Sequence, residues 1–200
     1  MPRLTLNKAQ LAKEKSALAM YRRYLPSLDL KRRQLMAERK RTEERIAALR
    51  REEAERVDGI GAAIPMLADR GIDLSGLATL KFVRLGERNV AGQRVPVVEE
   101  IEVEVAPYGR LGRPHWVDLT AERLRDVLRL RVEARVAERE IELLDAALAK
   151  VTQRINLFEK VLIPRTRANI RRLGIVLGDM ERSAVVNAKI GKRKREAAGP

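Results

Sequence analysis

The stretch VLRLRVEARVAEREIELLDAALAKVTQRINLFEKVL, residues 127–162, decides the fold of this chain. Its apolar residues recur every seven positions, from Val127 to Leu162, and a second apolar set follows each of the first five members by three positions. This is the heptad pattern of a helix that keeps one apolar stripe against one partner helix. The stretch therefore predicts one long helix of a coiled coil, whose seam includes Ile141, Leu144, Leu148, Val151, Ile155, Phe158 and Leu162.

Beyond Leu162 the apolar stripe moves by one residue and continues at Ile170, Leu173, Leu177 and Met180. Pro164 lies at this shift, where it removes one backbone hydrogen bond and favours a kink. We expect the C-terminal helix to span residues 117–190.

The N-terminal segment, residues 1–70, carries a weaker version of the same pattern. Leucines seven apart continue through Leu35, but Arg32 and Arg39 fall on seam positions. Pro26 interrupts the run and predicts a kinked or locally broken helix. The alternative is a true helix end there, with a new helix starting at Ser27.

Two apolar stripes of similar length need to be covered, because an isolated helix gains most of its stability by burying its stripe. Folding the first segment back against the last gives an antiparallel pair of ~65 residues, ~100 Å long at 1.5 Å per residue. Such a pair is expected to bring Leu18 close to Met180. From the pattern alone, a parallel homodimer remains an alternative.

The middle segment, residues 71–116, is predicted to form a small head that contains a β-hairpin. Residues 80–85 and 100–105 alternate in polarity, as half-buried strands do. Between them, Asn89 and Gly92 are turn residues, and Pro96 marks a sheet edge or a strand end. The expected fold is thus mainly α: a long antiparallel two-helix coiled coil, with this head inserted between the helices at the far end of the rod.

The composition fits long helices rather than a compact enzyme, since charged residues make up 35% of the 200 residues and aromatics only 3%. The absence of cysteine excludes disulfides and thiolate metal sites. No apolar run reaches the ~18 residues of a membrane span, and the N-terminus does not have the pattern of a secretory signal. A cytoplasmic location is expected. The net charge of +14 favours acidic partners, although most charges are expected on solvated helix faces. Residues 191–200 are predicted to be a basic, flexible tail.

No motif predicts catalysis or cofactor binding. Gly71 and Gly76 have the spacing of a phosphate-binding loop, but Leu77 and Ala78 stand where Lys and Ser or Thr are needed. His115 is the only histidine, and no second ligand accompanies it. The glutamates of residues 99–104 are interpreted as a solvent-exposed strand face. We therefore expect no catalytic residue, no cofactor and no metal.

Two segments resemble a known family. Residues 154–164, RINLFEKVLIP, resemble the R-V-N-A-L-E-x-V-x-I-P signature of the D subunits of V/A-type rotary ATPases. Residues 89–92, NVAG, followed by Pro96, are similar to that family's N-V-x-G-x-x-x-P hairpin. The register of Leu11, Leu18 and Leu35, and the downstream residues Ile170, Leu177, Glu181 and Arg182, are also similar to this family, so the resemblance spans essentially the whole chain. It departs at residues 183–186, SAVV, where the family usually has a longer acidic run and an aromatic residue.

The resemblance implies a central rotor shaft that transmits torque and does no chemistry itself. It implies a place inside a ring of catalytic and non-catalytic ATPase subunits, peripheral to the membrane, with the small F subunit alongside and a cup-like subunit on the membrane rotor below. By the same resemblance, Arg154, Asn156, Glu159 and Pro164 are candidates to face the ring. The hairpin at Asn89, Gly92 and Pro96 is expected at the shaft's lower end, where it would help to dock the F subunit or regulate coupling.

The alternative is a basic coiled-coil protein that binds nucleic acid, suggested by the net charge and the basic tail. Steep salt dependence of DNA binding would mark such a protein. A third class, the tRNA-gripping arm of a synthetase, requires an attached catalytic domain. Neither alternative accounts for residues 156–164, so nucleic acid is the disfavoured partner.

Overall fold

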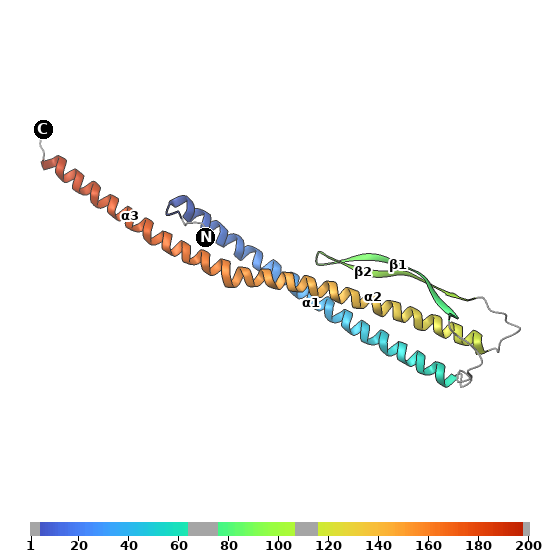
Figure 1. The fold of residues 1–200 in the computed structure, drawn as a ribbon. Helices are drawn as coiled ribbons and strands as arrows, with labels where there is room; N and C mark the ends of the chain where they lie inside the picture. Colours follow the sequence, from blue (N-terminus) through green and yellow to red (C-terminus); the bar gives the residue numbers. More distant parts are fainter. Residues whose placement is uncertain (1–4, 64–75, 107–115, 198–200) are drawn as a thin grey trace. The chain divides into compact units, whose positions relative to one another are not determined.

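The computed structural model describes residues 5–63, 76–106 and 116–197 of the chain. In chain order it contains α1 (Lys8–Ala63), β1 (Ala78–Val90), β2 (Gln93–Val105), α2 (Trp116–Asn156), the π-helical segment η2 (Leu157–Leu162) and α3 (Ile163–Ala197) (Figure 1). The predicted fold class is confirmed: the chain is mainly helical, and a two-stranded antiparallel sheet lies between the N-terminal and C-terminal helices in the sequence. The chain divides into a central unit, residues 31–150, and a terminal unit, residues 1–30 with 151–200.

Helix α1 begins at a side-chain cap and is not interrupted by its proline. The Asn7 side-chain oxygen accepts the backbone N–H of Gln10 at 2.7 Å, as an N-cap residue does. Pro26 lies inside the helix, and the Ser27 hydroxyl donates to the carbonyl of Tyr24 at 2.8 Å. The alternative of a helix end before Ser27 is therefore wrong.

In the central unit, α1 and α2 run antiparallel. Arg39 pairs with Asp145, Arg50 with Glu138, and Arg56 with Asp126, so numbers rise along one helix as they fall along the other. Arg39, which occupies a predicted seam position, thus bonds across the helix pair instead of packing in it. The side chains buried in this unit are mostly aliphatic and include Leu35, Val127, Leu130, Ala134, Ala137 and Leu144.

In the terminal unit, the start of α1 also runs antiparallel to α3. Lys8 pairs with Glu181 at 2.8 Å, and the Asn169 amide donates to Glu14 at 3.3 Å. The rings of Tyr21 and Phe158 lie 5.3 Å apart. The expected proximity of Leu18 and Met180 is wrong. Glu181, which follows Met180, pairs with Lys8, and Lys8 lies ten residues before Leu18 on α1.

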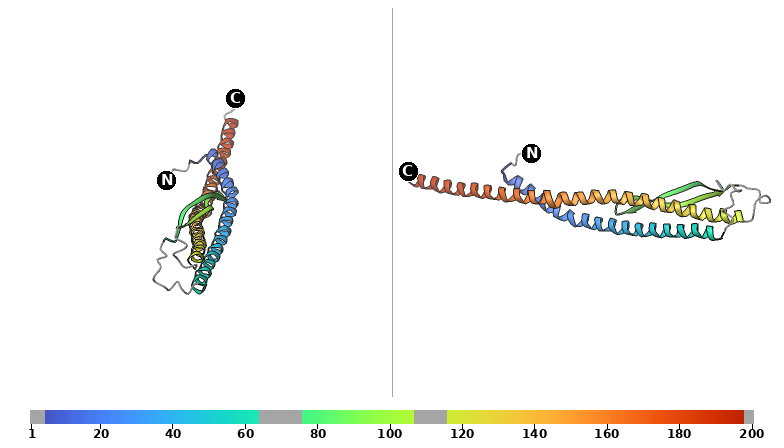
Figure 2. Two further views of the ribbon diagram at one scale, coloured as in Figure 1. Left: turned by 90° about the vertical axis from the view of Figure 1, so that its right-hand side faces the viewer. Right: turned by 60° about the horizontal axis from the view of Figure 1, so that its bottom comes forward.

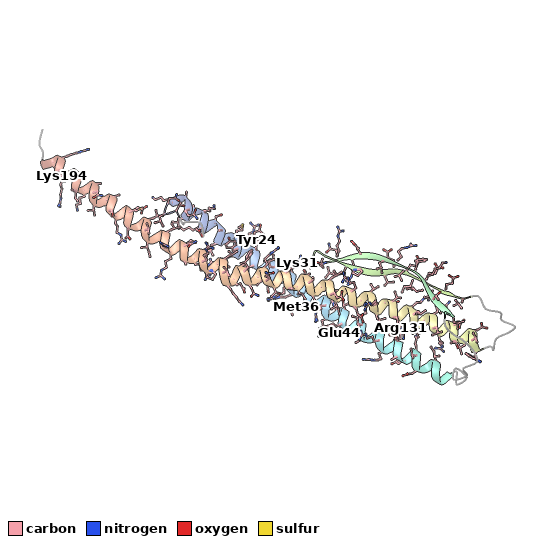
Figure 3. All side chains as sticks on the ribbon, viewed as in Figure 1. Tyr24, Lys31, Met36, Glu44, Arg131 and Lys194 are labelled. Carbon is pink, nitrogen blue, oxygen red and sulfur yellow. The ribbon has the colours of Figure 1, made fainter. Side chains whose placement is uncertain are left out.

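Helix α3 continues to Ala197, so the described part of the predicted basic tail, residues 191–197, is helical, and residues 198–200 lie outside the described residues. Lys192 and Glu196 form an i,i+4 pair at 3.8 Å, and Lys194 and Arg195 lie in the last turn, where positive charge favours the helix dipole. Every side chain from residue 179 to residue 196 is exposed; Lys194 is labelled on this part of α3 in Figure 3.

The two strands of the hairpin are joined by the two-residue turn Ala91–Gly92. Both turn residues have positive φ, 49° and 79°, as a type I′ turn requires. The Asn89 side chain accepts the N–H of Gly92 at 2.7 Å and fixes the turn. Pro96 lies within β2 opposite Glu87. A two-stranded sheet has only edge strands, so proline is tolerated there.

The hairpin lies along the helix pair of the central unit, with its turn well away from the helix ends (Figures 1 and 2). At its base, Leu77 and Val105 pack with Trp116 and Val117. At its turn, a Cβ on Gly92 would lie 3.2 Å from the ammonium of Lys31, a residue labelled in Figure 3. The expected position of the turn at the far end of the rod is therefore wrong. Folding back buries Val95 and Val103, which two strands alone leave in water. His115 and Gly71 lie outside the described residues.

The antiparallel register predicts which engineered cysteines can be joined in this cysteine-free chain. The pair Lys8→Cys and Glu181→Cys is expected to cross-link within one chain with a short bis-maleimide. The control pair, Leu18→Cys and Met180→Cys, is expected not to cross-link, because ten helical residues separate Leu18 from Lys8 by about 15 Å. Denaturing gel electrophoresis and mass spectrometry distinguish the products. A product formed only between chains at positions 8 and 181 would contradict this register.

Candidate functional site

Glu140 forms the centre of a charged cluster in the central unit. Its side chain is 0% exposed, and it is the one charged residue among those described that is buried. One carboxylate oxygen accepts a hydrogen bond from Arg45 of α1 at 2.7 Å, and the other accepts from Arg88 of β1 at 2.7 Å. A buried charge is costly unless such partners compensate it. Each oxygen of Glu140 thus has its own arginine, from a different element.

Arg88 connects the hairpin to both helices. The same guanidinium nitrogen that contacts Glu140 of α2 also donates to Glu38 of α1 at 2.6 Å. The hydrogen bond to Glu38 is the largest cause that raises the pKa of Arg88. We call Glu38, Arg45, Arg88 and Glu140 the latch. It is the point near the turn where α1, α2 and the hairpin meet.

Further ion pairs between α1 and α2 are more exposed than the latch. Hydrogen bonds from Arg50, and secondarily from Arg135, lower the pKa of Glu138, against an opposing effect of burial. A carboxyl whose pKa is lower in the folded state stabilises the fold above its unfolded pKa, and this contribution is lost as pH falls. Exposed pairs each contribute about 0–1 kcal/mol because water screens them. These pairs fix the register more than they add stability.

Between the latch and the hairpin base, β2 and the helix pair enclose a groove. The strands carry one extra residue each in this region, Lys81 on β1 and Glu99 on β2, which bends the hairpin. A Cβ at Gly86 would meet only the end of the exposed Glu99 side chain, which can move aside. The groove has a volume of about 470 Å³ and is lined by apolar and charged side chains, among them Leu49, Val136, Arg129 and Glu133.

The predicted seam residues of the C-terminal helices differ in burial. Leu144, Val151 and Ile155 are buried, whereas Ile141, Leu148, Phe158 and Leu162 are half-buried. Seam residues up to residue 150 belong to the central unit, and those from 151 onwards belong to the terminal unit. Half-burial follows from the geometry, because a single partner helix can cover only a narrow stripe.

The other predicted site residues are spread over two elements and do not form one site. Arg154, Glu159 and Pro164 are exposed, and Asn156 is half-buried, all in the terminal unit. In the hairpin, Asn89 and Gly92 are exposed and Pro96 is half-buried.

Sequence reasoning missed the latch. Glu140 directly precedes the seam residue Ile141, at a flanking position where coiled coils commonly carry charges that pair between helices. The same description fits several other glutamates of the chain, and nothing local to Arg88 indicates which carboxylate it meets. A signal for the latch would require knowledge of where the hairpin packs.

Metal binding and membrane insertion find no support in the described ranges. No three His, Asp or Glu side chains there lie close enough together to hold a metal ion. None of the helices described is at once long enough and apolar enough to cross a membrane.

Comparisons with known proteins identify relatives over nearly the full length. A family model for the D subunit of ATP synthase matches residues 10–193. The D subunit of the V-type ATP synthase of Borreliella burgdorferi is 35% identical over 192 residues, which cover 96% of this chain and 95% of the relative. Proteins of the same description from Chlamydia pneumoniae and Chlamydia felis are 30% and 32% identical, over 97% and 96% of this chain and 93% and 92% of the relatives.

The latch predicts that substitution of its arginine Arg88 costs more stability than substitution of its buried glutamate. Arg88→Met is expected to lower the free energy of unfolding by about 3 kcal/mol, because it leaves a buried carboxylate with one arginine. Glu140→Gln removes the charge itself and is expected to cost only about 1 kcal/mol. Adding Glu140→Gln to Arg88→Met should therefore restore stability in urea titrations followed by circular dichroism.

The matched control is Arg50→Met, which removes an exposed ion pair and is expected to change stability by less than about 1 kcal/mol. Strictly additive effects of Arg88→Met and Glu140→Gln would show that the two residues act independently, contrary to the latch.

Proposed function

Because this chain belongs to the D-subunit family of ATP synthases, we propose that it is the central rotor shaft of a V/A-type ATPase and transmits torque between the ATP-hydrolysing or ATP-synthesising ring and the ion-translocating membrane rotor. In this role the chain is a non-catalytic subunit on the cytoplasmic side, peripheral to the membrane. The ring supplies the chemistry, and the membrane rotor moves the ions.

The bracing of the helix pair in the central unit is the observation that best supports this role. Torque applied to two paired helices tends to slide one along the other. Arginine–carboxylate pairs at successive levels oppose sliding, because a shift of even one turn breaks all of them together. The latch opposes sliding as well, because a shift of α1 along α2 would separate the buried carboxylate of Glu140 from Arg45.

The proposed partners come from membership of the D-subunit family, and exposed residues in each unit are candidates to contact them. Arg154, Glu159 and Pro164 are candidates to contact the catalytic and non-catalytic ring subunits. For the F subunit, the exposed turn residues Asn89 and Gly92 are candidates, together with the exposed side chains Phe82 and Leu85 of β1. A cup-like subunit of the membrane rotor completes the proposed assembly.

Purification of the tagged chain from native membranes tests the assignment. The catalytic and non-catalytic ring subunits are expected to copurify with it at stoichiometric levels, and the isolated chain is expected not to hydrolyse ATP. Recovery of nucleic acid without ATPase subunits would reject the proposal, as would ATP turnover by the pure chain that one of its own substitutions abolishes.

The seam predicts a contrast between two adjacent residues. Ile155 is 3% exposed, whereas Arg154 is exposed. Ile155→Asp places an unpaired charge in the seam and is expected to lower the melting temperature of the isolated chain by about 10 °C. In the assembled complex it should also uncouple ATP hydrolysis from ion transport.

Arg154→Ala serves as the neighbouring control. It should leave the melting temperature within about 2 °C and change only assembly or rotation. Normal melting and normal coupling for Ile155→Asp would place the seam elsewhere.

A further inference from the structure

The C-terminal helices contain one turn of different geometry in the terminal unit. Residues 157–162 are π-helical, and the N–H of Ile163 donates to the carbonyl of Phe158, five residues earlier instead of four. The regular helix resumes as α3, with Pro164 as its second residue. A π turn holds one residue more than the α turn that it replaces, and single π turns are frequent at functional positions.

This extra residue coincides with the one-residue shift of the apolar stripe. Up to Leu162 the stripe repeats every seven residues, and it resumes at Ile170 and Leu177, one position late. A single additional residue accounts for the shift. Contacts with α1 occur within the π turn, at Phe158 with Tyr21, and beyond it, at Asn169 with Glu14. The π turn therefore absorbs one residue while the helix stays against α1.

The hydrogen-bond ladder is also weakened close to this turn on both helices. Pro164 has no N–H, so the carbonyl of Lys160 lacks its usual helical donor. On α1, Pro26 likewise deprives Arg22 of a donor. Pro26 and Pro164 each lie within about two turns of the contact between Tyr21 and Phe158.

We propose that residues 157–164 form a soft segment created by one inserted residue, at which the helix can change its twist by exchanging π for α hydrogen bonds without breaking the seam. The exposed side chains of Leu157 and Val161, 46% and 49% exposed, leave room for this exchange because they pack against little. The soft segment itself is argued from the helix geometry. Only its consequence rests on the proposed function: in a rotor shaft, this segment would absorb part of the twist that torque produces.

The proposal makes the extra residue dispensable, and this can be tested on the full chain alone. Deletion of Val161 is expected to convert the π turn into regular α-helix with a continuous heptad seam. The melting temperature should stay the same or rise, and amide hydrogen exchange of residues 158–166 should slow by at least about tenfold. The measurements are circular dichroism and hydrogen–deuterium exchange followed by mass spectrometry.

Two control variants make the outcome decisive. Deletion of Ala149, exposed in α2, is expected to lower the melting temperature strongly, because it moves the flanking seam residues to different faces. Pro164→Ala is expected to retain fast exchange, since the extra residue remains. A deletion of Val161 as damaging as that of Ala149 would overturn the proposal, as would slow exchange in Pro164→Ala. Neither result bears on copurification with the ATPase ring, so the two proposals fail separately.

Discussion

The shared carboxylate of Glu140 is the interaction on which the arrangement of the central unit depends. Two elements each contribute one arginine to it, Arg45 from α1 and Arg88 from β1. Packing of the hairpin and pairing of the helices are thereby coupled, because the loss of either contact leaves a buried charge partly unpaired. An apolar replacement of the whole cluster can be as stable as the ion pairs. The latch therefore contributes structural specificity more than stability. Only one register of the helices and one position of the hairpin give every charge of the latch a partner.

A two-helix interface explains why so much of this selection is ionic. Each helix can bury only a narrow stripe, and small side chains such as Ala134 and Ala137 occupy part of it. Apolar packing alone distinguishes poorly between registers that differ by one heptad, since every heptad presents a similar stripe. Arginine–carboxylate pairs beside the stripe are not periodic in the same way. The high charged fraction of the chain, 35%, is used here to specify alignment.

The sequence predicts those features whose causes are local. A seven-residue period is sufficient to identify the helix that contains Ile141 and Ile155, and alternation of polarity with a turn at Gly92 is sufficient for the hairpin. The packing of the hairpin depends on a contact between Arg88 and residues about 50 positions away, which no local pattern indicates. The shift of the apolar stripe after Leu162 is visible in the sequence. Both a proline and an inserted residue make a helix irregular, so the sequence alone attributes the irregularity to a kink at Pro164 and does not indicate a π turn. Register is the weakest prediction: the partner of Glu181 is Lys8, not a residue near Leu18.

The uncovered end of α3 has a consequence for the behaviour of the chain in solution. Val185, Val186 and Ile190 are 68%, 56% and 47% exposed, and they share this end of the helix with the basic side chains of residues 189–195. Mutual repulsion between these cationic ends keeps separate copies apart, while the aliphatic side chains favour their association. Added salt shortens the range of the repulsion to about 3 Å at 1 M and leaves the apolar attraction in place. Colloidal stability of the isolated chain should thus be greatest in dilute buffer and decline as ionic strength rises.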